Sequence, residues 1–275
     1  LFFTRKGRCY WLKCYEIPEG DKNFKGRAIQ NMLNIDPDDS VNALLRLRGL
    51  NDEEFVKSHY VVFATKNGTV KKTSLEAYSR PRTNGVNAIN IVEGDEVVDV
   101  RLTNGKNEII LANRNGRAVR FDEDSIRTMG RVATGVRGMR LDDGDDEVVG
   151  MIVVNNAETE TVMVVSENGY GKRSQVEDYR KTNRGGKGVK TFSITEKTGR
   201  LVAIKNVTDD NDLMIINKSG IAIRLAVSEC RVMGRATQGV RLINLSKKND
   251  VIASVCKVMS SEKEAEVDQE KEQSI

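Results

Sequence analysis

The feature of the sequence that constrains the fold most is an internal repeat. Residues 108–141 recur as residues 213–245, with Met233-Gly234-Arg235 in the place of Met129-Gly130-Arg131. In both copies an apolar run turns at a glycine, resumes as an alternating strand and enters a basic loop that a second glycine closes. These turn glycines and loop-closing glycines mark five copies: Gly7 and Gly26, Gly68 and Gly85, Gly116 and Gly135, Gly169 and Gly188, and Gly220 and Gly239.

This repeat predicts an all-β fold. Successive turn glycines lie 48 to 61 residues apart, and a period near 50 residues with several short strands is typical of a propeller-like array. Each unit is expected to form one small sheet of about four antiparallel strands, buried only against its neighbours. Gly, Asn and Asp occupy the turns because hairpin turns need positive φ. The expected units are about 1–50, 60–107, 108–160, 161–212 and 213–258.

Charge is distributed unevenly along the chain. The formal net charge is +4, but the last 17 residues contain six acids and two lysines, so residues 1–258 carry +8. Residues 259–275 are therefore expected to form an acidic, disordered tail. This tail would either keep the protein soluble or compete with a polyanion for the basic part of the chain.

The sequence predicts a protein of the cytoplasm. No apolar stretch approaches the roughly 20 residues that span a bilayer. Arg5 and Lys6 interrupt the apolar N-terminal residues too early for a signal peptide. The four cysteines suit a reducing compartment, where thiols stay free.

No catalytic or metal-binding set can be recognised. The four cysteines include no CxxC pair and His59 is the only histidine, whereas a zinc site needs four such ligands at short spacings. The loop Arg184-Gly185-Gly186-Lys187-Gly188 has neither the full pattern of a P-loop nor a helix expected after it. We therefore expect no active site, metal or cofactor in this chain.

Basic residues recur at fixed places in the repeats. Four residues after the turn glycine, the repeats have Trp11, Lys72, Arg120, Arg173 and Arg224, and further cations flank the loop-closing glycines. If repeats are related by rotation, these positions share one rim, which we call the basic belt. A regular belt of cations suits a phosphate backbone and reads no bases. The predicted phosphate-binding residues are Lys71, Lys72, Arg80, Arg82, Arg117, Arg120, Arg131, Arg137, Lys172, Arg173, Arg184, Lys187, Lys190, Arg224, Arg235 and Arg241.

Two further considerations bear on the basic belt. The loop-closing glycines lack a Cβ, so they would let phosphate oxygens approach the backbone N–H groups. The loops lack aromatic residues for stacking on unpaired bases, which favours duplex DNA over single strands. The alternative is that each cation is a solvated residue of an outer strand that pairs with one of the many carboxylates.

Several motifs resemble one family closely. TKNGTVKKTSLEAYSRPRTNGV, RNGRAVRFDEDSIRTMGRVATGVRGMRL, SENGYGKR and MGRATQGVRLINL are similar to the C-terminal domains of the A subunits of bacterial DNA gyrases, and the resemblance covers residues 1–258. It implies a β-pinwheel that wraps DNA around a basic rim and directs ATP-dependent negative supercoiling. It also implies that the rest of the gyrase A protein and the gyrase B protein are partners, and that the catalytic tyrosine of this type II topoisomerase lies elsewhere.

The chain departs from the family pattern at its start. In the family a box of the form QRRGGKG precedes the strand that matches Leu1, and this chain begins inside a strand. It is therefore expected to be an N-terminally truncated fragment with five of six repeats. The later sequence TNRGGKG at 182–188 keeps half of the box, and we do not identify it as the box.

Two rival interpretations remain open. The equivalent domain of the topoisomerase IV A protein resembles the same family, although its repeats are usually fewer or more degenerate. A propeller that serves as a protein-interaction scaffold would carry aromatic, hot-spot-rich loops instead of a rim of Arg and Lys. The regular second to fifth repeats and the acidic tail favour gyrase.

Overall fold

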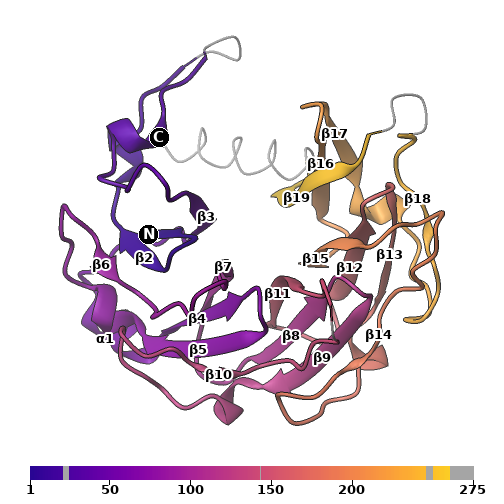
Figure 1. Cartoon of the computed structure of the whole chain (residues 1–275), viewed down its shortest axis with the longest axis horizontal. Coiled ribbons are helices and arrows are strands. Elements are labelled where there is room, and N and C mark those ends of the chain that lie inside the picture. The colour runs from indigo at the N-terminus through magenta and orange to yellow at the C-terminus, as the bar shows by residue number, and fades with distance from the viewer. Residues whose placement is uncertain (21–24, 143, 246–249, 261–275) are drawn as a thin grey trace, which may run out of the picture. The chain divides into compact units, whose positions relative to one another are not determined.

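The protein is described by a computed structural model over residues 1–20, 25–142, 144–245 and 250–260. It confirms the all-β prediction: the described residues form four four-stranded sheets and one three-stranded sheet (Figure 1). The one α-helix in these ranges is α1 (Glu53–Ser58), and the Asp52 side chain caps it. The predicted acidic tail falls almost wholly on residues 261–275, outside the described part.

The chain divides into two compact units. Unit 1 comprises Leu1–Asn107 and Glu123–Gly138, and unit 2 comprises Glu108–Asp122 and the chain from Met139 onward. Sheet A of unit 1 has the order β3-β1-β2-β6 and sheet B has the order β10-β5-β4-β7. Their strands are β1 (Phe2–Thr4), β2 (Arg8–Tyr10), β3 (Val41–Leu44), β4 (Tyr60–Thr65), β5 (Thr69–Ser74), β6 (Val86–Asn87), β7 (Val97–Thr103) and β10 (Val136–Arg137).

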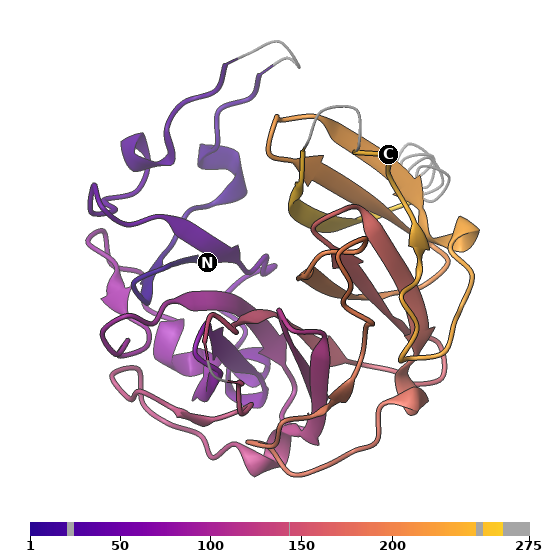
Figure 2. The same ribbon diagram turned by 45° about the vertical axis from the view of Figure 1, so that its right-hand side comes forward.

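Unit 2 contains three sheets (Figure 2, magenta to yellow). Sheet C has the order β11-β8-β9-β14, sheet D has β15-β12-β13-β18 and sheet E has β17-β16-β19. Their strands are β8 (Glu108–Asn113), β9 (Arg117–Asp122), β11 (Val148–Val154), β12 (Thr161–Ser166), β13 (Tyr170–Gln175), β14 (Val189–Lys190), β15 (Leu201–Val207), β16 (Asn211–Asn217), β17 (Ala222–Ala226), β18 (Val240–Arg241) and β19 (Ile252–Met259).

The chain also forms short 3-10 turns. Two of them, η1 (Cys14–Glu16) and η2 (Ile29–Asn31), lie in the first repeat. The others directly follow the second strand of a hairpin, and their carbonyl groups matter below. They are η3 (Leu75–Tyr78), η4 (Glu123–Ser125), η5 (Val176–Asp178) and η6 (Val227–Glu229).

The fourth strand of each four-stranded sheet comes from the next repeat. In sheet C, β14 follows the loop-closing Gly188 and pairs with β9 of the preceding repeat, where Val189 lies opposite Ala118. The same exchange joins β6 to β2, β10 to β5 and β18 to β13. The expectation that each repeat forms its own sheet was wrong in this respect. In sheet E, no strand among the described residues covers the outer edge of β17.

The loop-closing glycines are required by this exchange. A Cβ at Gly188 would lie 2.2 Å from the carbonyl oxygen of Ala118, and one at Gly239 would lie 2.3 Å from that of Gly171. Both glycines also have positive φ, +71° and +72°, which L side chains rarely adopt. Access of phosphates to the backbone, the role expected from the sequence, is not needed to explain these glycines, because the close approach to a neighbouring strand already requires them.

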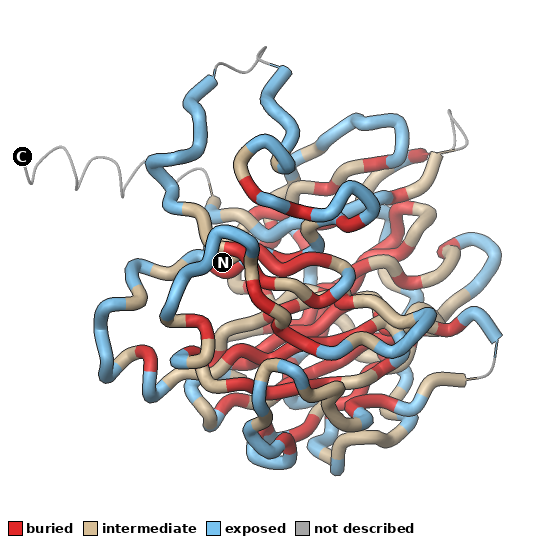
Figure 3. Tube along the Cα trace, turned by 60° about the vertical axis from the view of Figure 1, so that its left-hand side comes forward, coloured by how far each residue is buried: buried red, intermediate tan, exposed pale blue. Residues whose placement is uncertain are grey.

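Apolar side chains of the strands form the core. Figure 3 shows that buried residues follow the strands, whereas exposed residues follow the loops. In unit 1, the Phe3 ring packs edge to face on Phe63 and Tyr78, with centroids 5.3 and 5.8 Å away. In unit 2, Tyr179 and Phe192 are fully covered by Val and Ile side chains. No helix in the described ranges is long and apolar enough to cross a membrane.

Candidate nucleic-acid interface

The structure separates the predicted phosphate-binding residues by exposure. This division decides which side chains can reach a ligand. Exposed residues are Arg80, Arg82, Arg137, Lys187, Lys190, Arg224 and Arg241; half-buried residues are Arg117, Arg120, Arg131, Arg184 and Arg235; buried residues are Lys71, Lys72, Lys172 and Arg173.

The cations four residues after the turn glycine bind the next repeat. The Arg120 guanidinium donates hydrogen bonds to the carbonyl oxygens of Val176 and Tyr179, at 2.9 and 3.1 Å. Arg173 donates in the same way to the carbonyl oxygen of Val227 at 3.1 Å. Each acceptor lies in or directly after the short turn of the following repeat, so these side chains connect repeats and are not free for phosphate.

Lys72 has the same role in unit 1. Its ammonium group donates to the carbonyl oxygen of Glu123 at 3.2 Å and lies 3.8 Å from the carboxylate of that residue. The Glu123 side chain is fully buried and also accepts hydrogen bonds from the Thr103 hydroxyl and the Asn107 backbone N–H. A buried ion pair needs such extra hydrogen bonds, because burial removes both charges from water.

Acidic residues on the hairpins form ion pairs with two of the arginines that stand four residues after a turn glycine. Arg120 forms an ion pair with Glu108 at 2.5 Å, and Arg224 forms one with Asp212 at 2.6 Å. Partial burial alone would raise the pKa of Glu108, but hydrogen bonds from Lys181 and Arg120 lower the pKa overall. Arg120 therefore binds an acid of its own hairpin and carbonyl groups of the next repeat, so its guanidinium group is not available to a phosphate.

Lys71 and Lys172 lie beneath basic loops. The Lys71 ammonium donates to the carbonyl oxygens of Ala88 and Arg131 at 2.5 and 2.6 Å. Lys172 donates to the carbonyl oxygens of Gly234, at 2.7 Å, and of Arg235. Their side chains are covered, so they do not face a phosphate backbone as the sequence analysis predicted.

Most of the other predicted cations lie on four loops, of which residues 79–87 and 127–137 belong to unit 1 and residues 180–190 and 231–241 to unit 2. Some of them have protein partners: Lys187 pairs with Asp142 at 2.7 Å, and Arg241 donates to the Tyr170 hydroxyl at 2.9 Å. Arg235 donates to the carbonyl oxygens of Asp178 and Lys190.

Two predicted cations lie on the hairpins instead of the loops. Arg117, next to a turn glycine, donates to the carbonyl oxygen of Gly188 at 3.2 Å. Arg224 donates to the Met259 carbonyl oxygen at 2.7 Å in addition to its ion pair with Asp212. Both contacts hold neighbouring strands, so these two arginines contribute less to a ligand surface than the loop cations do.

Sequence reasoning missed one regular set of cations. Arg127, Arg180 and Arg231 are exposed, and each follows the buried residue that ends a short turn. Within the described ranges, no hydrogen bond or ion pair is formed by their guanidinium groups. All three stand eight residues before a loop-closing glycine, so the alignment that located the basic belt would also have found them.

The glycine-rich loop of the fourth repeat borders a hollow. This hollow has a volume of about 370 Å³ and is lined by Arg120, Arg180, Lys187 and the adjoining backbone. Strand β14 follows the loop, whereas a P-loop leads into a helix. No cluster of His, Cys, Asp and Glu in the described ranges could hold a metal ion.

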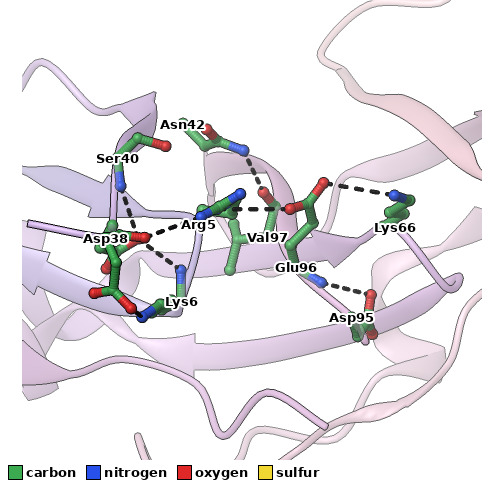
Figure 4. A network of polar contacts seen from close by, with 10 residues as sticks. Arg5, Lys6, Asp38, Ser40, Asn42, Lys66, Asp95, Glu96 and Val97 are labelled. Atoms are coloured by element: carbon green, nitrogen blue, oxygen red, sulfur yellow. Dashed lines mark hydrogen bonds and ion pairs between the residues drawn. The ribbon is translucent and has the colours of Figure 1, made fainter. Parts of the chain in front are cut away.

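Cations at two hairpin turns of unit 1 already pair with carboxylates. Arg5 and Lys66 both face the carboxylate of Glu96, at 3.7 and 3.8 Å, and Lys6 pairs with Asp38 (Figure 4). These turns therefore show the solvated ion pairs that were the alternative to a basic belt. The three exposed loop arginines of the preceding set differ from them, because no carboxylate in the described part of the chain pairs with them.

Comparison with known proteins identifies the family. The family model "DNA gyrase C-terminal domain, beta-propeller" matches residues 1–48, 59–104, 107–155, 160–208 and 211–256. The chain belongs to this family. It is 44% identical over 274 residues to the gyrase A protein of Staphylococcus aureus strain MRSA252, covering 100% of this chain and 30% of that protein. A second S. aureus gyrase A protein, from strain NCTC 8325 / PS 47, is 45% identical over 258 residues, 94% of this chain and 28% of its own length.

Solved structures show the same fold. The C-terminal domain of DNA topoisomerase IV superposes with a TM-score of 0.82 at 28% identity, covering 94% of this chain and 78% of that one. The DNA gyrase A C-terminal domain gives 0.80 at 24% identity, covering 94% and 81%. The chain spans about 30% of the length of the gyrase A protein of strain MRSA252. The predicted resemblance to the C-terminal domains of gyrase A proteins is confirmed.

Proposed function

We propose that this chain binds duplex DNA without reading its sequence and bends the duplex along its basic loops. The observation that carries the proposal is a set of exposed arginines, Arg127, Arg180 and Arg231, at matching positions of three repeats and without carboxylate partners among the described residues. Contact with phosphates releases counterions and needs no base recognition. The net charge of +8 over residues 1–258 supports the same ligand.

The chain would act as the accessory domain of the gyrase A protein. Held on the loops, a bent or wrapped duplex would be presented to the rest of that protein, and the gyrase B protein would supply ATP hydrolysis for negative supercoiling. Bending a duplex of 20–30 base pairs costs of the order of 1–6 kcal/mol, which many phosphate contacts together can offset. The fragment needs no cofactor for this role, and its place would be on the chromosomal DNA in the cytoplasm.

The test is the salt dependence of duplex affinity. Each lost phosphate contact lowers the slope of log affinity against log salt by about 0.9. The triple variant Arg127→Gln, Arg180→Gln and Arg231→Gln is therefore expected to lower the slope by about 2.7. The matched control removes three neutralised turn cations, with Arg5→Gln, Lys6→Gln and Lys66→Gln, and should lower it by less than about 1.

Two outcomes would contradict the proposal. Equal losses of slope in the two triple variants would show that general charge, and not the loops, binds DNA. A DNA affinity of the unaltered chain that does not depend on salt would favour a protein-interaction scaffold.

Bending of the duplex is measured separately, by the preference for long over short DNA fragments and by the linking number of DNA circles closed with the protein bound. The same measurements apply if the parent is topoisomerase IV.

A further inference from the structure

Two repeats place a lysine where a covered apolar or aromatic side chain would be expected. Three residues after the turn glycine, the five repeats have Tyr10, Lys71, Val119, Lys172 and Ile223. Lys71 and Lys172 are 0% and 1% exposed. Burial of an ammonium group is costly unless hydrogen bonds compensate it, so these lysines require a specific explanation.

The surroundings of Lys71 supply that compensation through carbonyl groups. Besides the carbonyl oxygens of Ala88 and Arg131, its ammonium group lies 5.4 Å from the centre of the Phe63 ring. The Tyr78 hydroxyl donates to the same Ala88 carbonyl oxygen. The charged group that faces Lys71 is the Arg131 guanidinium. Burial, and next the charge of Arg131, lower the pKa of Lys71 to about 7.

Lys172 repeats this arrangement in unit 2. Its ammonium group also contacts the Ser174 hydroxyl, at 3.3 Å, in addition to the two loop carbonyls. Burial, and next the charge of Arg235, lower the pKa of Lys172 to about 8, while Asp178 acts in the opposite direction. Both lysines are therefore held mainly by the backbone of a basic loop.

The loop above Lys71 is fixed at several points. The Met129 N–H donates to the Lys72 carbonyl oxygen at 2.7 Å, and the Ala133 N–H donates to the Gly130 carbonyl oxygen at 3.2 Å. Between these bonds, Lys71 holds the backbone of Arg131 from below. No hydrogen bond or ion pair of the Arg131 guanidinium is found in the described ranges, so this group is available to a ligand on a fixed backbone.

We propose that Lys71 and Lys172 are positioning residues for DNA binding, which fix the loop backbones at Arg131 and Arg235 so that loop cations meet phosphates in a set geometry. This inference rests on the proposed function. The lysines never touch DNA; they act through the carbonyl groups of the loops. An apolar residue of similar length would fill the space but remove the lysine donor from the Arg131 or Arg235 carbonyl and leave the loop free to shift.

The third repeat provides an internal control. Val119 occupies the equivalent position in sheet C, and its loop, residues 182–188, has no lysine beneath it. That loop carries Arg184, which is therefore expected to contribute independently of any buried lysine.

A double-mutant cycle tests the proposal for Lys71. We expect Arg131→Gln and Lys71→Met each to lower the salt slope by about 0.9, and the double variant to lower it by the same about 0.9, because one contact is lost in all three. In the control, Lys71→Met combined with Arg184→Gln should lower the slope by the full sum of about 1.8. An unchanged slope in Lys71→Met, or additive losses with Arg131→Gln, would overturn the proposal.

A pH profile of the salt slope covers the case in which Lys71→Met fails to fold. Deprotonation of Lys71 removes the positive charge that strengthens its hydrogen bonds to the carbonyl groups, so the slope of the unaltered chain should decrease as pH rises through about 7 and then about 8. Lys71→Arg keeps its charge, and the step near pH 7 should vanish. A pH-independent slope would contradict the inference alone, whereas a chain that binds no DNA would contradict the proposed function.

Discussion

Sheets C and E of unit 2 differ in whether a strand from a following repeat covers their outer edge among the described residues. In sheet C, strand β14 covers the edge of β9, and Arg120 reaches two carbonyls of the next repeat. In sheet E the edge of β17 is uncovered among the described residues, yet Arg224 keeps an acidic partner twelve residues earlier, as Arg120 does. The acid–arginine pair thus belongs to the hairpin, whereas the carbonyl contacts belong to the joint between repeats.

The largest difference is expected on removal of these two arginines. The Arg120 side chain is 10% exposed and that of Arg224 is 37% exposed. Arg120→Met removes the side-chain donor of the Tyr179 carbonyl, one of the two donors of the Val176 carbonyl and a partner of Glu108, so it should lower the free energy of unfolding by about 3 kcal/mol. Arg224→Met removes the ion pair with Asp212 at a more exposed arginine and, among the described residues, no contact to a following repeat, so it should cost less, about 1–2 kcal/mol. Urea unfolding measures both, and equal costs would show that the joint adds nothing.

The turn glycines offer a second, smaller contrast. Gly116 and Gly220 have nearly the same φ, +80° and +83°, but a Cβ at Gly116 would lie 2.8 Å from the Phe192 carbonyl oxygen, and one at Gly220 would meet nothing within 4 Å. Gly220→Ala should cost about 1–2 kcal/mol from backbone strain alone. Gly116→Ala should cost about 1–2 kcal/mol more, because atoms must also move apart. Similar unfolding midpoints for the two variants would contradict close packing across the joint.

The smallest effect concerns pH and sheet D. Burial lowers the pKa of Lys172 to about 8 from 10.5, so between these values the unfolded chain binds a proton that the folded chain does not. Lys172 should therefore contribute a rise of the free energy of unfolding with pH in this window, by no more than about 1.4 kcal/mol per pH unit, and no change below it, whereas Lys71 contributes a rise that begins near pH 7. Lys172→Met should reduce this rise. Sheets C and E, which carry Val119 and Ile223 instead, contribute none of it.

The sequence predicted those features that a long periodic pattern encodes. Two glycines per repeat located every hairpin, because a turn at positive φ leaves few alternatives to glycine. The strand exchange was missed because β14 has two residues, too few for an alternating pattern. Lys71 was placed at the surface because charged side chains are almost never fully buried. Arg127 was missed because only positions closer to the loop-closing glycine were compared between the repeats.

The strand exchange also sets a delay during synthesis. Strand β9 must wait for its partner β14, and the paired residues Ala118 and Val189 are separated by 71 positions along the chain. At roughly 5–20 residues per second on the ribosome, the open edge of β9 persists for about 4–14 s before its partner is made. Each following hairpin exposes the edge of its own second strand in the same way, until the strand of the next repeat that pairs with it is synthesised. A nascent chain of this kind therefore exposes an unpaired strand edge, which can pair with other chains, and slow translation should increase its demand for chaperones.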